Sequence, residues 1–264
     1  MSFKNKVIWI TGASSGIGEA LAYALAKQGA ILILSSRKVA VLEQVQQTCL
    51  KTCKEVYVQA LDLEQHDQIP SIVQKVVKER GRIDILVNNG GISQRSLVKD
   101  TIFEVDKRLM DINYLGTVAL TKALLPIFLE QQYGYFVTVT SLTGVFGTPY
   151  RSAYAATKHA LHGFFDSLRA ELIDDNIDVT LISPGFIKTQ VSINAFVGNG
   201  QAQGSMDNRQ DNGMEVDVFT QKMLRAMRKR KKEVYIGKKE VIMIYIKRFM
   251  PWLYHRMIAR VAVR

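Results

Sequence analysis

The sequence predicts a single α/β domain with a doubly wound, mostly parallel sheet of about seven strands and helices on both faces. Short apolar runs alternate with amphipathic stretches from residue 7 to residue 185, which is the pattern of β-α-β units. The runs are apolar at nearly every position, as expected of strands covered on both faces. With 264 residues, 47% of them hydrophobic, the chain is long enough to bury one large core.

The strands and helices can be assigned in order, because each apolar run ends at a polar or glycine-containing turn. The predicted strands are Val7–Ile10, Ile31–Leu34, Val56–Gln59, a strand within 82–91, then 135–141, 177–185 and a short seventh at Val234–Ile236. The predicted helices are 17–28, ended by Gly29, then Val39–Leu50, Ile69–Val77, Leu109–Leu129, Ser152–Ile173 and a basic helix near residue 222. No linker or repeat divides the chain, so residues 1–264 are treated as one domain.

Several kinds of site and segment are not expected. Cys49 and Cys53 lie four residues apart in a polar helical stretch, which suits two reduced thiols rather than a zinc cluster or a disulfide framework. None of the four histidines has other metal-ligating residues at a suitable spacing, so no metal site is expected. The apolar runs near the N-terminus and at Val241–Ile246 are too short for a signal sequence or a membrane span. We therefore expect a cytoplasmic protein.

Positive charge is concentrated at the C-terminal end. Residues 222–264 hold 14 Lys and Arg and only 2 Asp and Glu, whereas residues 1–221 hold 21 and 22. The last part of this segment mixes bases such as Arg256 and Arg260 with Phe249 and Trp252, the composition of an interfacial amphipathic segment. We expect 222–264 to touch an anionic membrane surface peripherally or to pair with a second subunit. Nucleic acid is not expected, since no binding motif accompanies the charge.

Residues 190–215 interrupt the alternation of strands and helices. They contain few apolar residues and many Gly, Asn and Gln, and they are too long for an ordinary connection. Such a segment is either a disordered insertion or a lid. Because it follows the carboxyl end of the sixth strand, where ligands of parallel sheets bind, a flexible substrate lid is the favoured interpretation.

The first strand is followed at once by "TGASSGIG", residues 11–18. A strand that feeds a glycine-rich turn and then a helix places backbone N–H groups and the positive end of the helix dipole at one point, which suits a pyrophosphate. Glycine lets the phosphate approach the backbone, and Ser14 and Ser15 can donate hydroxyl groups. Taken alone, the loop is also compatible with a tight turn that binds nothing.

The second strand ends in "SSRK", residues 35–38. Sites that bind NAD commonly have an acidic residue near here for the ribose 2′-hydroxyl, and this chain has none. Arg37 could instead pair with a 2′-phosphate through its forked donors. This favours NADP(H) over NAD(H), the alternative being a solvated surface arginine.

A third motif combines Ser141, at the end of a strand, with Tyr154 and Lys158, which lie four apart on one helix and so share a face. A tyrosine has an ordinary pKa of about 10, and a neighbouring ammonium would lower that pKa and make an acid/base pair. Ser141 could hydrogen-bond a carbonyl oxygen as charge develops on it. Tyr-x-x-x-Lys alone is common by chance.

The combination of motifs resembles the short-chain dehydrogenase/reductase family, over residues 5 to about 190. The matching motifs, in order, are "TGASSGIG", "LDL" at 61–63, "NNGG" at 88–91, Asn113, Ser141, Tyr154-x-x-x-Lys158 and "PGFIKT" at 184–189. "NNGG" departs from the family's usual NNAG. The end of the chain is similar to those of the membrane-associated steroid- and retinoid-type branch of this family.

The resemblance implies a Rossmann fold that holds a nicotinamide cofactor at the carboxyl edge of the sheet, with Asn88 holding the sheet itself. Residues implied beside the cofactor phosphates are Gly12, Ser14, Ser15, Gly16, Ile17 and Gly18. Residues implied beside the adenine and the riboses are Asp62, Leu63, Asn89, Gly90, Tyr154 and Lys158. The carboxamide would be held by Ile187 and Thr189, after Pro184 and Gly185.

The resemblance also implies catalytic roles. Tyr154 would donate the proton to the carbonyl oxygen, Lys158 would bind the nicotinamide ribose and lower the Tyr154 pKa, and Ser141 would orient the substrate oxygen. Asn113 would hold a water in a proton relay. The implied reaction is transfer of a hydride between NADP(H) and a carbonyl or alcohol. The basic, aromatic tail favours an apolar substrate.

The sequence is also compatible with two other functions. One is an NAD-dependent dehydrogenase of a small polar alcohol, and the other is a non-catalytic scaffold that senses NADPH at a membrane surface. A sensor has no need for an acid such as Tyr154 beside Ser141 and Lys158, which speaks against the scaffold. A homodimer or homotetramer is expected, since the helices at 109–129 and 152–173 are long and would leave faces exposed.

Overall fold

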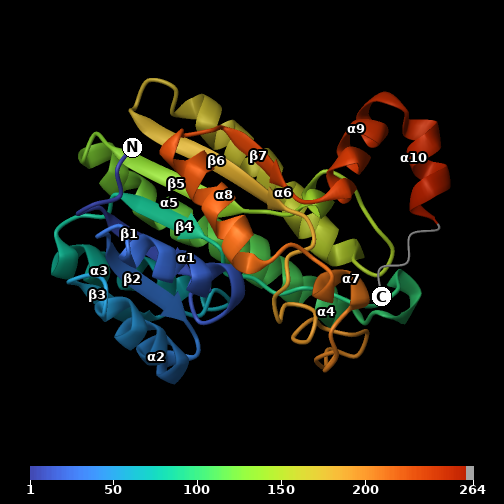
Figure 1. Cartoon of the computed structure of the whole chain (residues 1–264), viewed down its shortest axis with the longest axis horizontal. Coiled ribbons are helices and arrows are strands. Elements are labelled where there is room, and N and C mark those ends of the chain that lie inside the picture. Colours follow the sequence, from blue (N-terminus) through green and yellow to red (C-terminus); the bar gives the residue numbers. More distant parts are fainter. Residues whose placement is uncertain (260–264) are drawn as a thin grey trace.

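Seven parallel strands form one sheet, in the order β3-β2-β1-β4-β5-β6-β7, within residues 1–259, which the computed structural model describes (Figure 1). The strands are β1 Val7–Thr11, β2 Ile31–Ser36, β3 Val56–Ala60, β4 Ile85–Asn88, β5 Gly134–Val139, β6 Ile177–Pro184 and β7 Glu233–Ile236. All six neighbouring pairs run parallel. The doubly wound fold and its seven strands are therefore confirmed.

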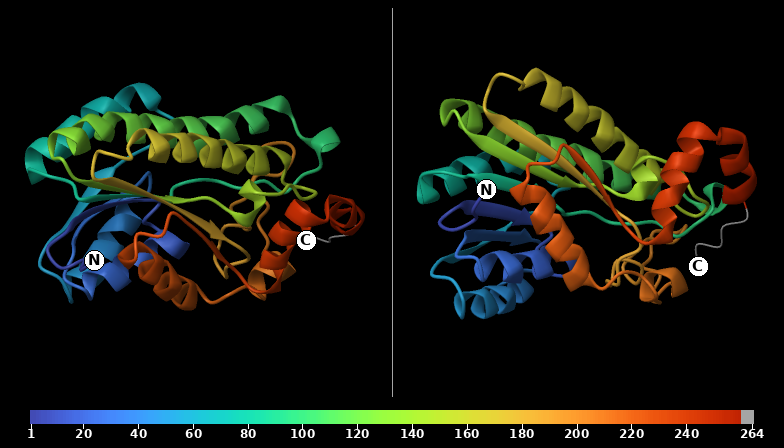
Figure 2. Two further views of the ribbon diagram at one scale, coloured as in Figure 1. Left: turned by 90° about the horizontal axis from the view of Figure 1, so that it is seen from above. Right: turned by 45° about the horizontal axis from the view of Figure 1, so that its top comes forward.

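Helices cover both faces of the sheet (Figure 2). They are α1 Gly16–Ala26, α2 Val39–Leu50, α3 Ile69–Arg80, α4 Phe103–Met110, α5 Gly116–Glu130, α6 Ser152–Glu171, α7 Asn208–Asp211, α8 Val216–Arg228, α9 Ile242–Phe249 and α10 Pro251–Ile258. Buried side chains of α1, α2 and α8 share one core with the sheet, and those of α3, α5 and α6 share a second core on the opposite face.

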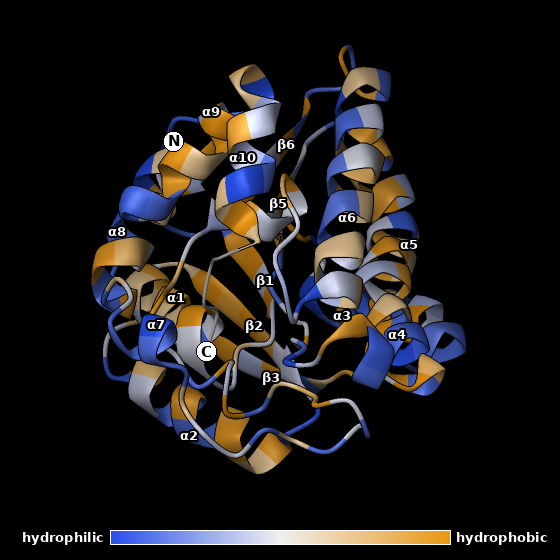
Figure 3. Ribbon diagram, turned by 90° about the vertical axis from the view of Figure 1, so that its right-hand side faces the viewer, coloured by the Kyte–Doolittle hydropathy of each residue, from blue (hydrophilic) through white to orange (hydrophobic). Residues whose placement is uncertain are grey.

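The apolar runs are explained by these two cores. Within β1, Ile8 and Ile10 belong to the core under α1, whereas Val7 and Trp9 belong to the core under α3 and α5. Successive side chains of a strand point to opposite faces, so a strand with helices on both faces has no polar side to offer. Figure 3 accordingly shows β1 and β2 as hydrophobic strands between the helical layers.

The fourth predicted helix is longer than expected, and it is not regular. Helical structure begins at Phe103 rather than Leu109, and a π-helical turn at Asp111–Leu115 joins α4 to α5. Such turns commonly occur at functional sites, and this one contains Asn113. The run Phe103–Glu130 is long and apolar enough to cross a membrane by length and composition alone, a test that core helices also pass. It lies on the sheet as a core helix, with Leu120 and Leu124 fully buried.

The two cysteines behave as expected. Cys49 is a buried free thiol on α2, and Cys53 is a partly exposed free thiol. Burial raises the pKa of the Cys49 thiol to about 12, so this side chain acts as a small core residue.

The C-terminal segment ends in a helical hairpin of α9 and α10, which projects beyond the carboxyl edge of the sheet (Figure 1). Met243, Ile244 and Tyr254 pack against Leu142 and Phe146, in the loop that follows β5. The Tyr254 hydroxyl also donates a hydrogen bond to the Gly147 carbonyl, at 2.6 Å. The amphipathic part of the predicted 222–264 segment is therefore attached directly to the loop that carries Ser141. Arg260 lies outside the described residues.

Candidate active site

A cavity of about 480 Å³ lies at the carboxyl edge of the sheet. It is lined by the loops that follow β1, β2, β3, β4, β5 and β6 and by part of the 190–215 segment. The cavity is therefore where the ligand of a doubly wound sheet is expected.

The glycine loop folds closely against the start of α1 and the loop after β4. Gly12 and Gly16 have φ angles of +64° and +58°, which side chains other than glycine rarely adopt. A Cβ on Gly18 would lie 2.3 Å from the Gly12 carbonyl oxygen. Ser15 makes no side-chain hydrogen bond as the N-cap of α1, so it leaves the N–H groups of the first turn to other acceptors. This arrangement fits a phosphate at the start of α1.

Thr11 and Asn89 hold the loops after β1 and β4 together. The Thr11 hydroxyl oxygen accepts hydrogen bonds from the backbone N–H groups of Asn89 and Gly90, at 3.0 and 2.9 Å. The Asn89 side chain donates to the carbonyls of Thr11 and Gly12, at 3.0 and 3.3 Å. The Asn88 side chain donates to Thr138 of β5 and to Thr121 of α5, so it joins β4 to the neighbouring strand and to a covering helix.

The residues expected around the adenine half of the cofactor line the same cavity. Arg37, Asp62 and Leu63 all line it. Arg37 is exposed, and the Asp62 carboxylate accepts a hydrogen bond from the backbone N–H of Glu64, at 3.1 Å. An exposed guanidinium at the end of β2 is free to approach a 2′-phosphate.

Ser141, Tyr154 and Lys158 line the cavity close to one another. Ser141 is buried just after β5, and its hydroxyl oxygen accepts hydrogen bonds from the N–H and hydroxyl groups of Thr143, at 3.1 and 2.9 Å. Tyr154 and Lys158 lie one turn apart on α6, and both line the cavity. The Lys158 ammonium donates to the Val139 carbonyl at 3.0 Å, and its Nζ lies 5.8 Å from the centre of the Tyr154 ring.

The pKa of Tyr154 differs from the expectation that Lys158 lowers it. Burial raises the pKa of this phenol above its ordinary value of 10.0, while Arg151, a hydrogen bond from Ser141, and Arg95 oppose the rise. Burial also lowers the pKa of Lys158 to about 8. A phenol is protonated at neutral pH already at its ordinary pKa, and the rise keeps Tyr154 in that form.

Asn113 lies behind the cavity and does not line it. Its side-chain oxygen accepts from the Ile92 N–H at 2.8 Å, and its amide nitrogen donates to the Ile92 carbonyl at 2.9 Å and to Thr157 at 3.2 Å. The π-helical turn thereby joins the loop after β4 to α6. Both polar atoms of the Asn113 side chain already have protein partners. A water relay through Asn113 stays a prediction.

The loop after β6 completes the cavity. Pro184, Gly185, Ile187 and Thr189 all line it. Gln210 of α7 donates hydrogen bonds to the Ile187 carbonyl and to the Thr189 hydroxyl. The carboxylate of Glu240 accepts from the Phe186 N–H at 3.1 Å, so segments on both sides of α8 fix this loop.

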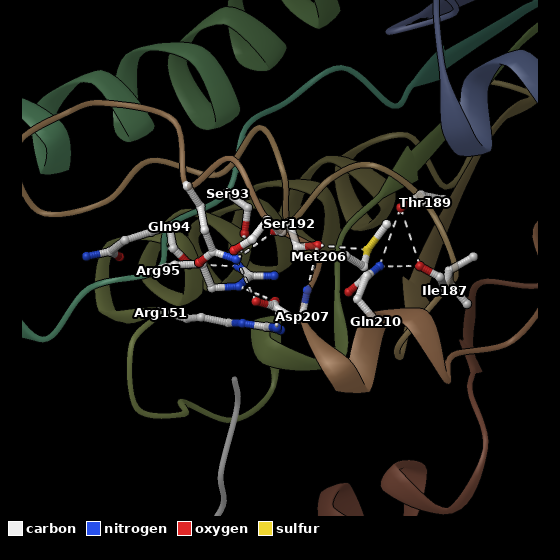
Figure 4. A network of polar contacts seen from close by, with 12 residues as sticks. Ser93, Gln94, Arg95, Arg151, Ile187, Thr189, Ser192, Met206, Asp207 and Gln210 are labelled. Atoms are coloured by element: carbon white, nitrogen blue, oxygen red, sulfur yellow. Dashed lines mark hydrogen bonds and ion pairs between the residues drawn. The ribbon is translucent and has the colours of Figure 1, made fainter.

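Part of the 190–215 segment lines the cavity. Gln190, Val191, Asn194, Phe196, Ala202 and Gln210 line the cavity. The segment is attached by short bridges from Phe196 to Gln94 and from Met214 to Ile187, and by a buried ion pair between Arg95 and Asp207 at 2.5 Å (Figure 4). Opening of this segment as a flexible lid stays a prediction.

Sequence reasoning missed Arg95, Arg151 and Asp207, which are all buried beside the cavity. Arg95 follows the "NNGG" motif and Arg151 begins α6, but Asp207 lies in the polar segment where charged residues carry little information. The pairing joins residues 112 positions apart, and a single sequence holds no signal for it.

Apart from Asn113 and Gly18, all the predicted catalytic and cofactor-binding residues line this one cavity. Gly18 allows α1 to approach the glycine loop. Within residues 1–259, no group of three or more potential metal-ligating side chains exists. His159 and His162 also make structural contacts, with the Ala155 carbonyl and with Thr140.

Comparisons with known proteins identify relatives along nearly the whole chain. A family model described as short chain dehydrogenase matches residues 6–198. The human protein "Dehydrogenase/reductase SDR family member 7" is 41% identical over 261 residues, which cover 95% of this chain and 77% of the relative. A Drosophila melanogaster protein, "Dehydrogenase/reductase SDR family protein 7-like", is 39% identical over 264 residues, covering 98% of this chain and 81% of the relative.

Solved structures share the fold. A short chain dehydrogenase/reductase from Burkholderia phymatum in complex with NAD superposes with a TM-score of 0.84 at 19% identity, covering 96% of each chain. An alcohol dehydrogenase from the archaeon Thermococcus sibiricus, complexed with 5-hydroxy-NADP, has a TM-score of 0.73 at 24% identity, covering 89% of this chain and 97% of the other. One neighbour holds NAD and the other an NADP derivative, so the fold alone does not select between them.

Proposed function

The chain belongs to the short-chain dehydrogenase/reductase family of oxidoreductases, and from that premise we propose that it transfers a hydride between NADP(H) and a lipophilic carbonyl or alcohol. The observation that carries the proposal is the presence of Ser141, Tyr154 and Lys158 in the same cavity as the glycine loop. When bound, the nicotinamide cofactor supplies or accepts the hydride. The loop, the start of α1 and Arg37 fit its phosphates.

The side chains around Tyr154 account for the proton. Its phenol is protonated at neutral pH at the ordinary tyrosine pKa of about 10, and burial raises that pKa further. In the reductive direction Tyr154 can therefore protonate the carbonyl oxygen as the hydride arrives. The Ser141 hydroxyl can hydrogen-bond the same oxygen. Lys158 would exchange its bond to the Val139 carbonyl for one to the cofactor ribose.

Turnover on a panel of carbonyls with NADPH tests this proposal. We expect reduction of ketones or aldehydes by the wild type, and Tyr154→Phe should lower kcat/KM by about 100- to 10,000-fold, the range for loss of a general acid. The variant should still bind NADPH, because the glycine loop and Arg37, which fit the cofactor phosphates, are unchanged. NADPH binding without turnover of any carbonyl would instead support the sensing scaffold.

The preference for NADP(H) rests on Arg37. It is exposed and lines the cavity next to the end of β2, and "SSRK" provides no carboxylate for a ribose 2′-hydroxyl. An NAD-dependent dehydrogenase of a small polar alcohol is the alternative that this arrangement disfavours.

The helical hairpin supports a lipophilic substrate and peripheral contact of a cytoplasmic protein with an anionic membrane. Phe249 and Trp252 are 74% and 68% exposed, while Arg248 and Arg256 lie on the same two helices. Aromatic and basic side chains together suit a lipid interface. Because the hairpin packs on the loop that follows Ser141, a substrate leaving the membrane would be close to the site.

Vesicle flotation tests the membrane contact in the full chain. We expect the wild type to float with phosphatidylserine vesicles and the double variant Phe249→Ser/Trp252→Ser to stay in the dense fraction. Val98 and Phe103 are 73% and 74% exposed elsewhere, so Val98→Ser/Phe103→Ser is the matched control and should float. Equal flotation of all three removes the idea. If light scattering shows that only the hairpin variant loses a dimer or tetramer, the hairpin is a subunit interface instead.

A further inference from the structure

Two buried arginines beside the cavity share one carboxylate. Arg95, Arg151 and Asp207 are only 1%, 7% and 3% exposed. Arg95 Nε lies 2.5 Å from Asp207 Oδ2, whereas Arg151 Nη2 lies 3.7 Å from the same oxygen. Figure 4 shows both arginine side chains pointing toward Asp207. The cluster of these three side chains therefore carries one positive charge in excess.

Asp207 does not satisfy Arg151. One carboxylate oxygen is engaged by Arg95, and the other accepts a hydrogen bond from Gln203 Nε2 at 2.8 Å. Two buried nitrogens of Arg151, Nε and Nη2, have no hydrogen-bond partner anywhere in residues 1–259. A buried guanidinium whose nitrogens lack hydrogen bonds is costly, and the ion pair with Asp207 at 3.7 Å does not supply them. Burial, followed by the charge of Arg95, lowers the pKa of Arg151 to about 9.

The position of Arg151 points to the substrate rather than to the cofactor. The phosphate-binding features are at the start of α1 and the end of β2, whereas Arg151 immediately precedes α6, one turn before Tyr154. Both side chains line the cavity. The Phe186 ring lies 5.3 Å from Arg151 Cζ and forms an apolar wall beside the guanidinium.

We propose that Arg151 is the anion-binding residue of the substrate site, and that the carbonyl substrate carries a carboxylate or phosphate group. This rests on the proposed function and narrows its substrate class. The planar donors of a guanidinium match an oxyanion bidentately. An anionic head held by Arg151 would place a nearby carbonyl at Tyr154, and an apolar body would remain compatible with the hairpin. The natural substrate is then an amphiphile rather than a neutral lipid.

The test compares matched pairs of probes with NADPH. One pair is 4-oxodecanoate and its methyl ester, and the other is dihydroxyacetone phosphate and dihydroxyacetone, so that the two arms separate carboxylate from phosphate. For the wild type we expect a higher kcat/KM for the charged member of one pair. Arg151→Gln should reduce that charged-to-neutral ratio by about 10- to 100-fold, the range of a charge-assisted hydrogen bond.

Arg209→Gln is the matched control. Arg209 is exposed, and its guanidinium lies 5.8 Å from the same Phe186 ring, so it tests the effect of a nearby but screened charge. This variant should leave the ratio unchanged. Arg151→Gln removes the excess positive charge of the cluster and leaves the pair of Arg95 and Asp207 in place. The variant should therefore unfold at the same or a higher temperature than the wild type, which would show that it is folded.

Three results would overturn the proposal. One is an equal loss for the charged and neutral members in Arg151→Gln, which would mean that Arg151 acts through Tyr154. Another is a wild type that prefers both neutral members, which would leave the reductase function intact. If no carbonyl is turned over, the proposed function fails, and the anion subsite is tested by binding alone. Calorimetry would then measure binding of 4-hydroxydecanoate and of inorganic phosphate to the NADP⁺-loaded protein. Binding that is lost in Arg151→Gln supports the subsite, and absence of binding by the wild type refutes it.

Discussion

The glycine loop and the 190–215 segment face each other across one cavity, but different interactions hold them in place. Backbone groups hold the glycine loop: Gly12 and Gly18 allow close approach, and Thr11 bonds two consecutive N–H groups. Side chains from distant parts of the sequence hold the 190–215 segment, above all the buried pair of Arg95 and Asp207. Local backbone geometry leaves a motif in the sequence, whereas a single long-range ion pair leaves none.

Breaking the ion pair of Arg95 and Asp207 should have the largest effect, and it should loosen the 190–215 segment without changing the glycine loop. Asp207→Asn leaves Arg95 and Arg151 buried without a carboxylate, and loss of one partner of a buried pair costs about 3–5 kcal/mol. We expect the unfolding free energy to fall by that amount and the 190–215 amides to exchange faster, while NADPH affinity stays near wild type. Urea unfolding and hydrogen exchange measure these effects.

The control for that variant is Asp211→Asn at the end of α7, the short helix that Asp207 precedes. Asp211 is 58% exposed at its side chain and pairs with Lys188 at 3.4 Å, and exposed pairs contribute about 0–1 kcal/mol. A comparable loss of stability in both variants would show that the buried pair has no special role in attaching the segment.

A larger side chain at Gly18 should displace the glycine loop and leave the 190–215 segment in place. In Gly18→Ala the new methyl group would meet the Gly12 carbonyl at 2.3 Å, and backbone cannot move aside cheaply. We expect a stability loss of about 1–3 kcal/mol, typical of overpacking, together with weaker NADPH binding because the loop is displaced. Calorimetric titration and thermal unfolding provide the two readouts.

Gly163→Ala is its matched control. Gly163 lies in α6, and a Cβ there would meet nothing within 4 Å. Alanine in place of a helical glycine should stabilise by about 0.5–1 kcal/mol and leave NADPH binding unchanged. If Gly18→Ala binds NADPH as tightly as Gly163→Ala, the close approach of α1 is not needed for the cofactor site.

Lys158 lines the cavity that both regions share, and its buried charge should lower the stability of the folded protein. Burial lowers its pKa from 10.5 to about 8, so between these values the unfolded chain holds a proton that the folded protein has released. The unfolding free energy therefore rises with pH across this window. Lys158→Met removes the buried charge and should stabilise the unliganded protein at pH 7 by about 1–3 kcal/mol.

The gain should shrink as the pH rises above about 8, because the wild-type side chain then becomes neutral. Urea unfolding at pH 7 and pH 9.5, without cofactor, measures the difference. Activity should be lost at both pH values. A variant less stable than the wild type at pH 7 would contradict the account, since it would mean that the bond from Lys158 to the Val139 carbonyl outweighs the cost of burial.

Much of the fold could be predicted from the sequence, because each strand is an apolar run closed by a turn, and the observed ends differ by only a few residues. The helix at Leu109–Leu129 was predicted too short, since the polar first turn at Phe103–Met110 and the π-helical turn interrupt its apolar pattern. The cavity-lining motifs were identified because the local backbone geometry and chemistry require particular residue types there. The raised pKa of Tyr154 could not be predicted, because it depends on burial and on Arg151, which lies near Tyr154 only in the folded protein.

The paired dissociation constants of NADPH and NADH test the central claim, an NADP(H) site built from local motifs, most directly. They should be measured by titration calorimetry on the wild type, on Arg37→Ala and on Lys51→Ala, an exposed control at the end of α2. We predict that the wild type and Lys51→Ala bind NADPH about 10- to 100-fold more tightly than NADH, and that Arg37→Ala erases the difference. Wild-type binding of NADH as tight as that of NADPH would contradict the claim and make oxidation of an alcohol with NAD the better interpretation.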